Sequence, residues 1–442
     1  MTVTSPELNL LPFADLGLEA PLLKTIAKQG YITPTPIQSK VIPLVLSGRD
    51  VMGLAQTGTG KTAAFGLPLT QQLLNAEHKP ASKCVRALVL APTRELVCQI
   101  ADNMRDFVKG TPLSVNMVVG GASIQNQCKA LARGSDVLIA TPGRLLDLIK
   151  RKAVVLDKTQ YLVLDEADQM LDLGFIHDLR RIAQLIGGAR QTLLFSATMP
   201  KQISELSRAY LTDAVRVEMA PPGQAADKIR QSVHFMKQED KANVLKVSLL
   251  EHPEDLSLVF ARTKHGAEAL MKKLVAAGFD AASIHGNKSH AQRSRVIRDF
   301  KDSKVKILVA TDVAARGIDI PGVKYVYNYD LPHIAENYVH RIGRTARAGR
   351  KGHAISLCCG AEISFLRDIE KLMGIRIKVA SGDEPQAETP VGQGAKGRKR
   401  PNRSGARRRQ PNEDRTRAKT SGRKKASGKR KSSGPSKTHS AA

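Results

Sequence analysis

The sequence predicts an α/β protein with two parallel-sheet domains in tandem and a basic tail. Short apolar runs rich in Val, Ile and Leu recur with helical stretches between them. Such continuous runs, rather than alternating ones, are typical of strands that a parallel sheet buries on both faces. The alternation occurs twice, on either side of a small, Pro- and Gly-rich segment that is expected to be a linker. We therefore expect a first domain at 1–219, a linker at 220–226, a second domain at 227–380 and a disordered tail at 381–442.

The individual elements follow from the same pattern. The predicted strands are 50–54, 85–90, 137–140, 161–164 and 192–195 in the first domain, and 256–260, 306–310 and 325–329 in the second. A helix is predicted at 63–74, and an amphipathic helix is predicted after Pro200.

The composition disfavours several classes of protein. With 42% hydrophobic and 25% charged residues among 442, the chain is typical of a globular protein with large cores. No apolar run approaches the roughly 20 residues that a membrane-spanning helix needs, and the N-terminal segment lacks the pattern of a secretory signal. The five cysteines form neither a CxxC pair nor a metal-ligand cluster, so we expect reduced thiols in a cytoplasmic protein.

Positive charge is concentrated in the predicted tail. The formal net charge of the chain is +28, and residues 381–442 alone hold 18 Lys and Arg against 5 Asp and Glu, without any Phe, Tyr, Trp, Leu or Ile. Such a segment cannot bury enough apolar surface to offset the entropy of ordering, so disorder is predicted. The charge favours a polyanionic partner, most often nucleic acid, over the alternative of a merely soluble basic protein.

A glycine-rich segment between the strand at 50–54 and the helix at 63–74 predicts a phosphate-binding loop. Glycines let successive backbone N–H groups point at one anion beside a helix N-terminus. In this arrangement Lys61 reaches the β- and γ-phosphates and the Thr62 hydroxyl coordinates Mg²⁺, although Ala55 stands where the usual pattern has Gly. The loop residues are Ala55, Gln56, Thr57, Gly58, Thr59, Gly60, Lys61 and Thr62.

Two carboxylates follow the predicted strand at 161–164, where open parallel sheets place their ligands. An acidic cluster alone is more often a solvated loop or a helix cap. Because this one follows a buried strand and a phosphate loop, Asp165 is expected to hold Mg²⁺, either directly or through one of the ion's ligands, and Glu166 to polarise the attacking water.

The run Asp165-Glu166-Ala167-Asp168 resembles the signature of the DEAD-box RNA helicases, and the other motifs of that family follow in order. The resemblance covers roughly residues 10–375, and within the family the sequence looks most like the bacterial RhlE-type helicases. It implies two RecA-like domains, ATP and Mg²⁺ as cofactors, and RNA as the partner.

The resemblance also assigns further nucleotide contacts. Gln38 is expected to read the adenine edge, since a carboxamide presents a donor and an acceptor side by side, and Tyr31 to stack on the ring, with Phe13 as the upstream aromatic. From the second domain, Asp319 is expected at the ribose, and Arg344 and Arg347 at the γ-phosphate as arginine fingers.

RNA contacts and coupling residues are implied in the same way. The RNA-contacting candidates combine turn residues with an Arg or a hydroxyl, which suits phosphate and sugar contacts; they are Pro92, Thr93, Arg94, Gly120, Gly121, Thr141, Pro142, Gly143, Arg144, Arg262, Arg293 and Thr311. The residues expected to link ATP to RNA are Asp168, Ser196, Thr198 and His340.

One position departs from the family pattern. The family usually has Gln-x-x-Arg after the His-Gly of the second domain, whereas here His290 precedes Arg293 at the Gln position. A shifted register that uses Gln292 is the alternative. An imidazole cannot reproduce the donor and acceptor pair of an amide, so the departure puts the coupling to RNA in doubt rather than ATP hydrolysis.

The resemblance thus implies an ATP-dependent RNA helicase that unwinds short duplexes locally and remodels ribonucleoproteins. Two alternatives stay open: an RNA chaperone or annealing protein whose binding ATP controls, and a DNA translocase. The absence of Trp and the 4% aromatic content disfavour an extended base-stacking platform. The tail is expected to add RNA affinity, with a solubilising or protein-docking tail as the alternative. Ribosomal or RNA-degradation proteins are candidate partners.

Overall fold

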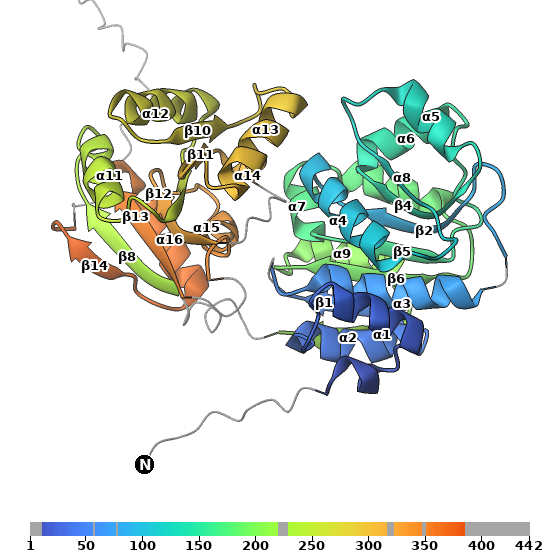
Figure 1. Ribbon diagram of the computed structural model, residues 1–442. Helices are drawn as coiled ribbons and strands as arrows, with labels where there is room; N and C mark the ends of the chain where they lie inside the picture. The colour runs from blue at the N-terminus through green and yellow to red at the C-terminus, as the bar shows by residue number, and fades with distance from the viewer. Residues whose placement is uncertain are drawn as a thin grey trace, which may run out of the picture. The chain divides into compact units, whose positions relative to one another are not determined.

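The computed structural model describes residues 11–55, 58–76, 78–219, 229–315, 322–346 and 351–384. These residues build two parallel sheets of seven strands each, with helices on both faces (Figure 1). The predicted fold class, two RecA-like α/β domains in tandem, is confirmed. The predicted linker at 220–226 and the predicted tail beyond residue 384 lie outside the described residues.

The first sheet has the strand order β3-β4-β2-β5-β6-β1-β7. Its strands are β1 Val51–Leu54, β2 Val85–Leu90, β3 Val115–Val118, β4 Ser135–Ala140, β5 Tyr161–Leu164, β6 Gln191–Ser196 and β7 Val215–Glu218. Its helices are η1 Phe13–Leu16, α1 Ala20–Lys28, α2 Pro36–Leu46, α3 Lys61–Asn75, α4 Arg94–Phe107, α5 Ile124–Leu131, α6 Pro142–Lys150, α7 Ala167–Asp172, α8 Ile176–Leu185 and α9 Lys201–Tyr210. All strand pairs are parallel, so the carboxyl ends of the strands share one edge.

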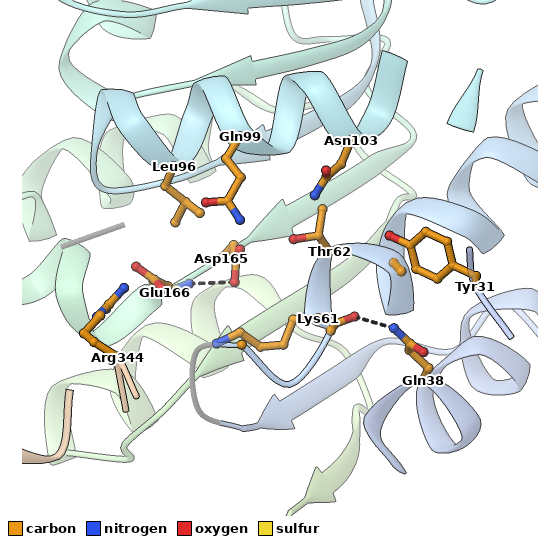
Figure 2. Close-up of a pocket in the computed structure, with 13 residues that line it drawn as sticks. Tyr31, Gln38, Lys61, Thr62, Leu96, Gln99, Asn103, Asp165, Glu166 and Arg344 are labelled. Atoms are coloured by element: carbon orange, nitrogen blue, oxygen red, sulfur yellow. Dashed lines mark hydrogen bonds between the residues drawn. The ribbon is translucent and has the colours of Figure 1, made fainter. Parts of the chain in front are cut away.

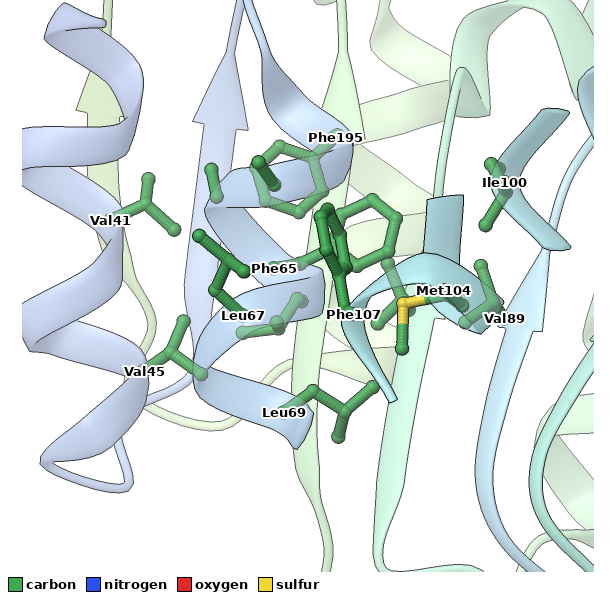
Figure 3. Packing of buried hydrophobic residues seen from close by; sticks show 14 of the residues in the cluster. Val41, Val45, Phe65, Leu67, Leu69, Val89, Ile100, Met104, Phe107 and Phe195 are labelled. Carbon is green, nitrogen blue, oxygen red and sulfur yellow. The ribbon is translucent and has the colours of Figure 1, made fainter. Parts of the chain in front are cut away.

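Each face of the first sheet carries its own apolar core. Along β2, Val89 points into the core under α1 to α4, while Leu88 and Leu90 point into the core under α6 to α9. Phe65 on α3 and Phe195 on β6 lie 5.6 Å apart by ring centroids in the first of these cores (Figure 3). Because both faces are buried, the central strands are apolar without alternation, as the sequence predicts.

The second sheet has the strand order β10-β11-β9-β12-β13-β8-β14, again all parallel. Its strands are β8 Ile229–Phe235, β9 Leu256–Phe260, β10 Ala281–Ile284, β11 Ile307–Ala310, β12 Val323–Asn328, β13 Gly352–Cys358 and β14 Lys378–Ser381. Its helices are α11 Lys241–Leu250, α12 Lys264–Ala276, α13 His290–Lys301, α14 Asp312–Ala315, α15 Ala335–Ile342, η3 Gly360–Glu362 and α16 Ile363–Met373.

Every strand predicted from the sequence is present, with ends that differ by at most two residues. The strands that the prediction omits include the short edge strands β3, β7 and β14. Because an edge strand has a neighbouring strand on one side only, these strands are short, with four residues each, and are half-buried or exposed at most positions; β14 is exposed at every residue. The helix predicted at 63–74 begins earlier, at Lys61, since Gly60 in the left-handed conformation ends the loop there. The predicted domain end at residue 380 falls inside β14. No helix among the described ranges is long and apolar enough to cross a membrane.

Candidate functional site

The predicted phosphate-binding loop lies between β1 and α3. Gly60 has a φ of +92°, and a Cβ added there would lie 2.5 Å from Gln38 Nε2, so both its conformation and its surroundings require glycine. Lys61 opens α3, is 6% exposed, and donates from Nζ to the Ala55 carbonyl oxygen at 2.9 Å. Gly58, Thr59 and Thr62 lie in the described part of the loop, whereas Gln56 and Thr57 lie outside it.

The predicted adenine-reading residues adjoin this loop. Gln38 Nε2 donates to the Gly60 carbonyl at 3.1 Å, while its Oε1 accepts from the Thr35 backbone N–H at 2.8 Å. The amide therefore ties α2 to the phosphate loop. Tyr31 packs edge-on between Phe13 and Phe107, at centroid distances of 6.2 and 6.0 Å. Phe13 is buried and supports Tyr31 from behind.

The acidic pair follows β5. Glu166 adopts a left-handed conformation with φ of +55°, and its N–H donates to Asp165 Oδ1 at 3.0 Å. Burial raises the pKa of the Asp165 carboxyl to about 6, against the opposing effect of the nearby Lys61 ammonium. Glu166 Oε2 is buried without a hydrogen-bond partner among the described residues. Two buried carboxyls in this state call for a cation or a polar ligand, because an unpartnered buried acceptor is costly.

These groups converge on one cavity (Figure 2). Leu96, Gln99 and Asn103 on α4 also line it, opposite Lys61 and Thr62. No sequence pattern marks these three residues, since only the fold brings α4 across the loop. The cavity is lined by Tyr31, Gln38, Gly58, Gly60, Lys61, Thr62, Ala63, Leu96, Gln99, Asn103, Asp165, Glu166 and Arg344.

A Mg²⁺-bound nucleotide fits these residues. Lys61 and the N-terminus of α3 supply positive charge for phosphates. The Thr62 hydroxyl and the Asp165 carboxyl supply the oxygen ligands that Mg²⁺ prefers. The unpartnered Glu166 Oε2 is the acceptor that a bound water or hydroxyl would satisfy.

Asp168 lies two residues after Glu166, at the start of α7, and binds the turn after β6. Its Oδ2 accepts from the Ala197 N–H at 3.0 Å, the Thr198 N–H at 2.9 Å and the Thr198 hydroxyl at 3.0 Å. His340 Nε2 lies 3.6 Å from the same oxygen. Burial by itself would raise the pKa of the Asp168 carboxyl, but His340, Lys61 and the Thr198 hydroxyl together hold it below its ordinary value. Ser196 closes the turn by donating to the Thr198 carbonyl at 2.7 Å.

The predicted RNA-contacting residues of the first domain also come together. They follow β2, β3 and β4, which are neighbours in the sheet. Gly121, with φ of +75°, packs so closely on the Arg94 guanidinium that an added Cβ would lie 2.1 Å from Nη1. Arg144 Nη1 donates to the Ala122 carbonyl at 3.0 Å. Pro92, Thr93, Gly120, Thr141, Pro142 and Gly143 belong to the same three strand ends, with Thr93 and Thr141 at the N-caps of α4 and α6.

In the second domain, Arg262 follows β9 and Thr311 follows β11. Arg293 on α13 pairs with Glu95 Oε1 at 2.9 Å. Arg344 lines the nucleotide cavity and donates from Nε to the His340 carbonyl at 3.2 Å. Arg347 and Asp319 lie outside the described residues, as does the side chain of His290.

Two further side chains of the second domain, Gln292 and Arg341, have local structural partners. Gln292 caps its own helix, since its Oε1 accepts from the Ser289 N–H at 2.9 Å; this local bond occupies the amide that the shifted register would use. Arg341, which the sequence analysis left without a role, is 1% exposed, pairs with Asp312 and lies over the Phe260 ring at 4.9 Å. Arg341 thereby joins α15 to the start of α14 and to the end of β9.

Comparisons with known proteins agree with this geometry. The family model described as DEAD/DEAH box helicase matches residues 35–206, and the model described as helicase conserved C-terminal domain matches residues 240–349. An ATP-dependent RNA helicase CshA from Limosilactobacillus reuteri is 43% identical over 367 residues, which are 83% of this chain and 73% of the relative. A DEAD-box ATP-dependent RNA helicase CshA from Streptococcus pneumoniae is 44% identical over 368 residues, 83% of this chain and 69% of the relative.

Solved structures give the same result. Dbp5 from S. cerevisiae bound to RNA and ADP BeF3 has a TM-score of 0.75 and 34% identity, and the match covers 84% of this chain and 95% of that one. Mss116p bound to ssRNA and AMP-PNP has a TM-score of 0.78 and 29% identity, over 87% of this chain and 82% of that one. The predicted RhlE-type subdivision remains a prediction. Since both family models match in order and relatives above 40% identity align over most of their own length, the chain belongs to the DEAD-box family of ATP-dependent RNA helicases.

Proposed function

We propose that this protein uses ATP binding and hydrolysis to separate short RNA duplexes locally and to remodel ribonucleoproteins in the cytoplasm. The observation that carries the proposal is that the carboxyl-terminal edge of the first sheet holds two separate groups of candidate residues. Nucleotide-site residues follow the adjacent strands β5, β6 and β1, and RNA-contact candidates follow the adjacent strands β3, β4 and β2. The two groups of strand ends are therefore parts of one rigid sheet.

ATP is held by the first domain. Lys61 leaves the Ala55 carbonyl to bind the β- and γ-phosphates, and Tyr31 and Gln38 contact the base. Thr62 and Asp165 hold Mg²⁺, which neutralises phosphate charge when it is bound. Asp319 from the second domain contacts the ribose.

Hydrolysis requires groups from both domains. Glu166 orients the attacking water and accepts its proton through the unpartnered Oε2. Arg344 and Arg347 place guanidinium charge on the developing phosphoryl charge, which accelerates the reaction only when both domains reach the nucleotide.

Asp168 links the two activities. Its hydrogen bonds from Thr198 and its 3.6 Å contact with His340 Nε2 join α7, which directly follows Glu166, to the turn after β6 and to α15. A change at the nucleotide therefore reaches elements of both domains. RNA is held along its phosphates by Arg94, Arg144, Arg262 and Arg293, without base selection. The tail adds affinity through counterion release. Ribosomal or RNA-degradation proteins are candidate partners of the protein as a whole.

The test is steady-state ATP turnover with single-stranded RNA and with DNA of the same sequence. We expect strong stimulation by RNA, little by DNA, and loss of the RNA-stimulated activity in Lys61→Ala. Equal stimulation by DNA would favour the translocase alternative, and annealing that persists in Glu166→Gln while strand separation is lost would add an annealing activity. Undiminished turnover in Lys61→Ala would contradict the nucleotide assignment.

The tail is tested by deleting residues 385–442. We expect weaker RNA binding with a shallower salt dependence, because fewer counterions are released, and little change in ATP turnover at saturating RNA. If the deletion leaves RNA binding the same as that of the full chain at every salt concentration, the solubilising or protein-docking alternative is favoured.

A further inference from the structure

The second sheet repeats the strand order of the first, with β8 in the place of β1 and β12 in the place of β5. The helix after β1 begins at Lys61, and the helix after β8 begins at Lys241. Asp165 directly follows β5, and Asp330 comes two residues after β12. The second domain thus carries a lysine and a carboxylate at the positions that bind nucleotide in the first.

Lys241 is fully buried, and its charge is satisfied from within the protein. Its Nζ contacts Glu362 Oε2 at 2.5 Å, lies 3.7 Å from Asp330 Oδ1, and donates to the Tyr329 carbonyl at 2.8 Å. By contrast, Lys61 Nζ contacts a backbone carbonyl. Glu362 therefore provides for Lys241 the negative charge that a phosphate would provide for Lys61.

Glu362 is surrounded as a bound anion would be. The side chain is 1% exposed, and its oxygens accept from the Leu331 N–H at 3.1 Å and the Cys359 N–H at 3.3 Å. The Arg262 guanidinium pairs with Oε1. Two cations and two backbone N–H groups around one carboxylate make a site of the kind that binds phosphate elsewhere.

Arg262 is the outermost member of this cluster. Its side chain is 36% exposed, and its guanidinium carbon lies 5.7 Å from the centre of the Phe365 ring. Its backbone N–H donates to Asp330 Oδ2 at 2.9 Å. Since a guanidinium has five N–H donors, one pair with Glu362 anchors it and leaves it able to bind a phosphate. The Arg262 side chain is thus held by the buried Glu362 carboxylate, while part of it remains exposed to solvent.

We propose that Glu362 is an internal anion that fills the second domain's counterpart of the phosphate position and thereby positions Arg262 for RNA. Glu362 is a positioning residue, since it acts through Arg262. Lys241 neutralises the buried carboxylate, and the cluster closes the second domain to nucleotide. The inference rests on the proposed function in that Arg262 binds RNA.

The experiment is Glu362→Gln in the full chain, measured as the RNA concentration that gives half-maximal ATP turnover. Gln keeps the shape and removes the charge, so the charge-assisted bond to Arg262 is lost. We expect the half-maximal RNA concentration to rise about tenfold, the size expected for one such bond, while turnover at saturating RNA stays within about twofold. Arg262→Ala should raise it similarly, and adding Glu362→Gln to Arg262→Ala should change it no further.

Glu370→Gln is the matched control. Glu370 is also a buried carboxylate on the same chain segment, paired with Arg367 and Arg376, and no contact joins it to Arg262 among the described residues. We expect it to alter stability without altering the half-maximal RNA concentration. If Glu362→Gln alone folds poorly, Lys241→Met with Glu362→Gln removes both buried charges, and it should still raise the half-maximal RNA concentration.

Two results would overturn the inference: an unchanged half-maximal RNA concentration in folded Glu362→Gln, or an equal rise in the Arg262→Ala background. Both are measured against wild-type protein that RNA stimulates. A wild type without RNA stimulation would instead contradict the proposed function, so the two failures are distinguishable.

Discussion

The two sheets share one strand order and differ in which polar groups they leave unpartnered. In the first, the Lys61 ammonium donates to the backbone carbonyl of Ala55, and Glu166 Oε2 has no hydrogen-bond partner within the described ranges. In the second, the corresponding lysine, Lys241, is saturated by Glu362 and neighbouring groups. The repeated fold fixes positions at the strand ends, and the chemistry depends on whether a ligand or the protein itself completes them.

The two domains also differ at the corresponding strands β3 and β10, which lie at the other side of each sheet. After β3, Gly120 and Gly121 bring the backbone against Arg94. After β10, His285 precedes Gly286, and Glu268 Oε2 accepts from Ser283 and lies 3.0 Å from both His285 Nε2 and Lys288 Nζ. In the first domain, glycine conformation shapes the backbone after β3. In the second domain, the Glu268 carboxylate binds the side chains at the end of β10 and beyond.

The largest expected difference between the domains concerns Glu166. Glu166→Gln removes the proton acceptor, so ATP turnover at saturating RNA should fall by about 10²- to 10⁴-fold, while nucleotide still binds. Glu362→Gln, the corresponding loss of a buried carboxylate in the second domain, should leave that turnover within about twofold of wild type, as expected of a group that only positions another. Comparable turnover losses in both variants would break the comparison.

Replacing Lys241 should lower stability, whereas replacing Lys61 should abolish nucleotide binding. Lys241→Ala leaves the buried Glu362 carboxylate without its main cation, so the free energy of unfolding should fall by about 3–5 kcal/mol. Lys61→Ala should abolish nucleotide binding with little loss of stability, since the Asp165 carboxyl, whose pKa burial already raises to about 6, can take up a proton instead. Urea unfolding and nucleotide titration of both variants measure this; a strongly destabilised Lys61→Ala would contradict it.

A smaller effect is expected at Gly121, which packs on the RNA-contact candidate Arg94. Gly121→Ala forces a Cβ against Arg94 and places Ala in the left-handed region, at a cost of about 1–2 kcal/mol. The half-maximal RNA concentration should rise because Arg94 is displaced. Gly110→Ala is the matched control: its φ is +81°, but nothing lies within 4 Å of the added Cβ. It should share the loss of stability and leave RNA binding unchanged. Equal RNA affinities in the two variants would argue against the assigned role of Arg94.

The smallest effect concerns pH. Hydrogen bonds from Ser283 and His285, with Lys288, lower the pKa of Glu268 to about 2, against the opposing effect of burial. A lowered pKa in the folded state means that the ionised form stabilises the fold. This contribution is present above about pH 4.5 and is lost as the pH falls toward 2. Urea unfolding at pH 5 and pH 3.5 should show a smaller loss of stability in Glu268→Gln than in wild type.

The predictions for the first domain's candidate site rest on local signals. The strand at 161–164, the loop at 55–62 and the acidic pair depend on residues adjacent in sequence, and the structure brings them together at one cavity. Residues that act through tertiary contact were not predictable. Gln99 and Asn103 read as ordinary polar residues of an amphipathic helix until α4 crosses the loop. Lys241 and Glu362, 121 positions apart, read as solvated charges although both are buried.

The number of nucleotides bound per chain tests the central comparison most directly. Equilibrium titration of the full chain with a slowly hydrolysed ATP analogue and Mg²⁺ should give one site per chain. Lys61→Ala should give none. Lys241→Met with Glu362→Gln should still give one, because this variant removes the closing carboxylate together with the lysine that a phosphate would need. Two sites in wild type, or one site that persists in Lys61→Ala, would contradict the account that the first sheet binds nucleotide while the second is closed by its own carboxylate.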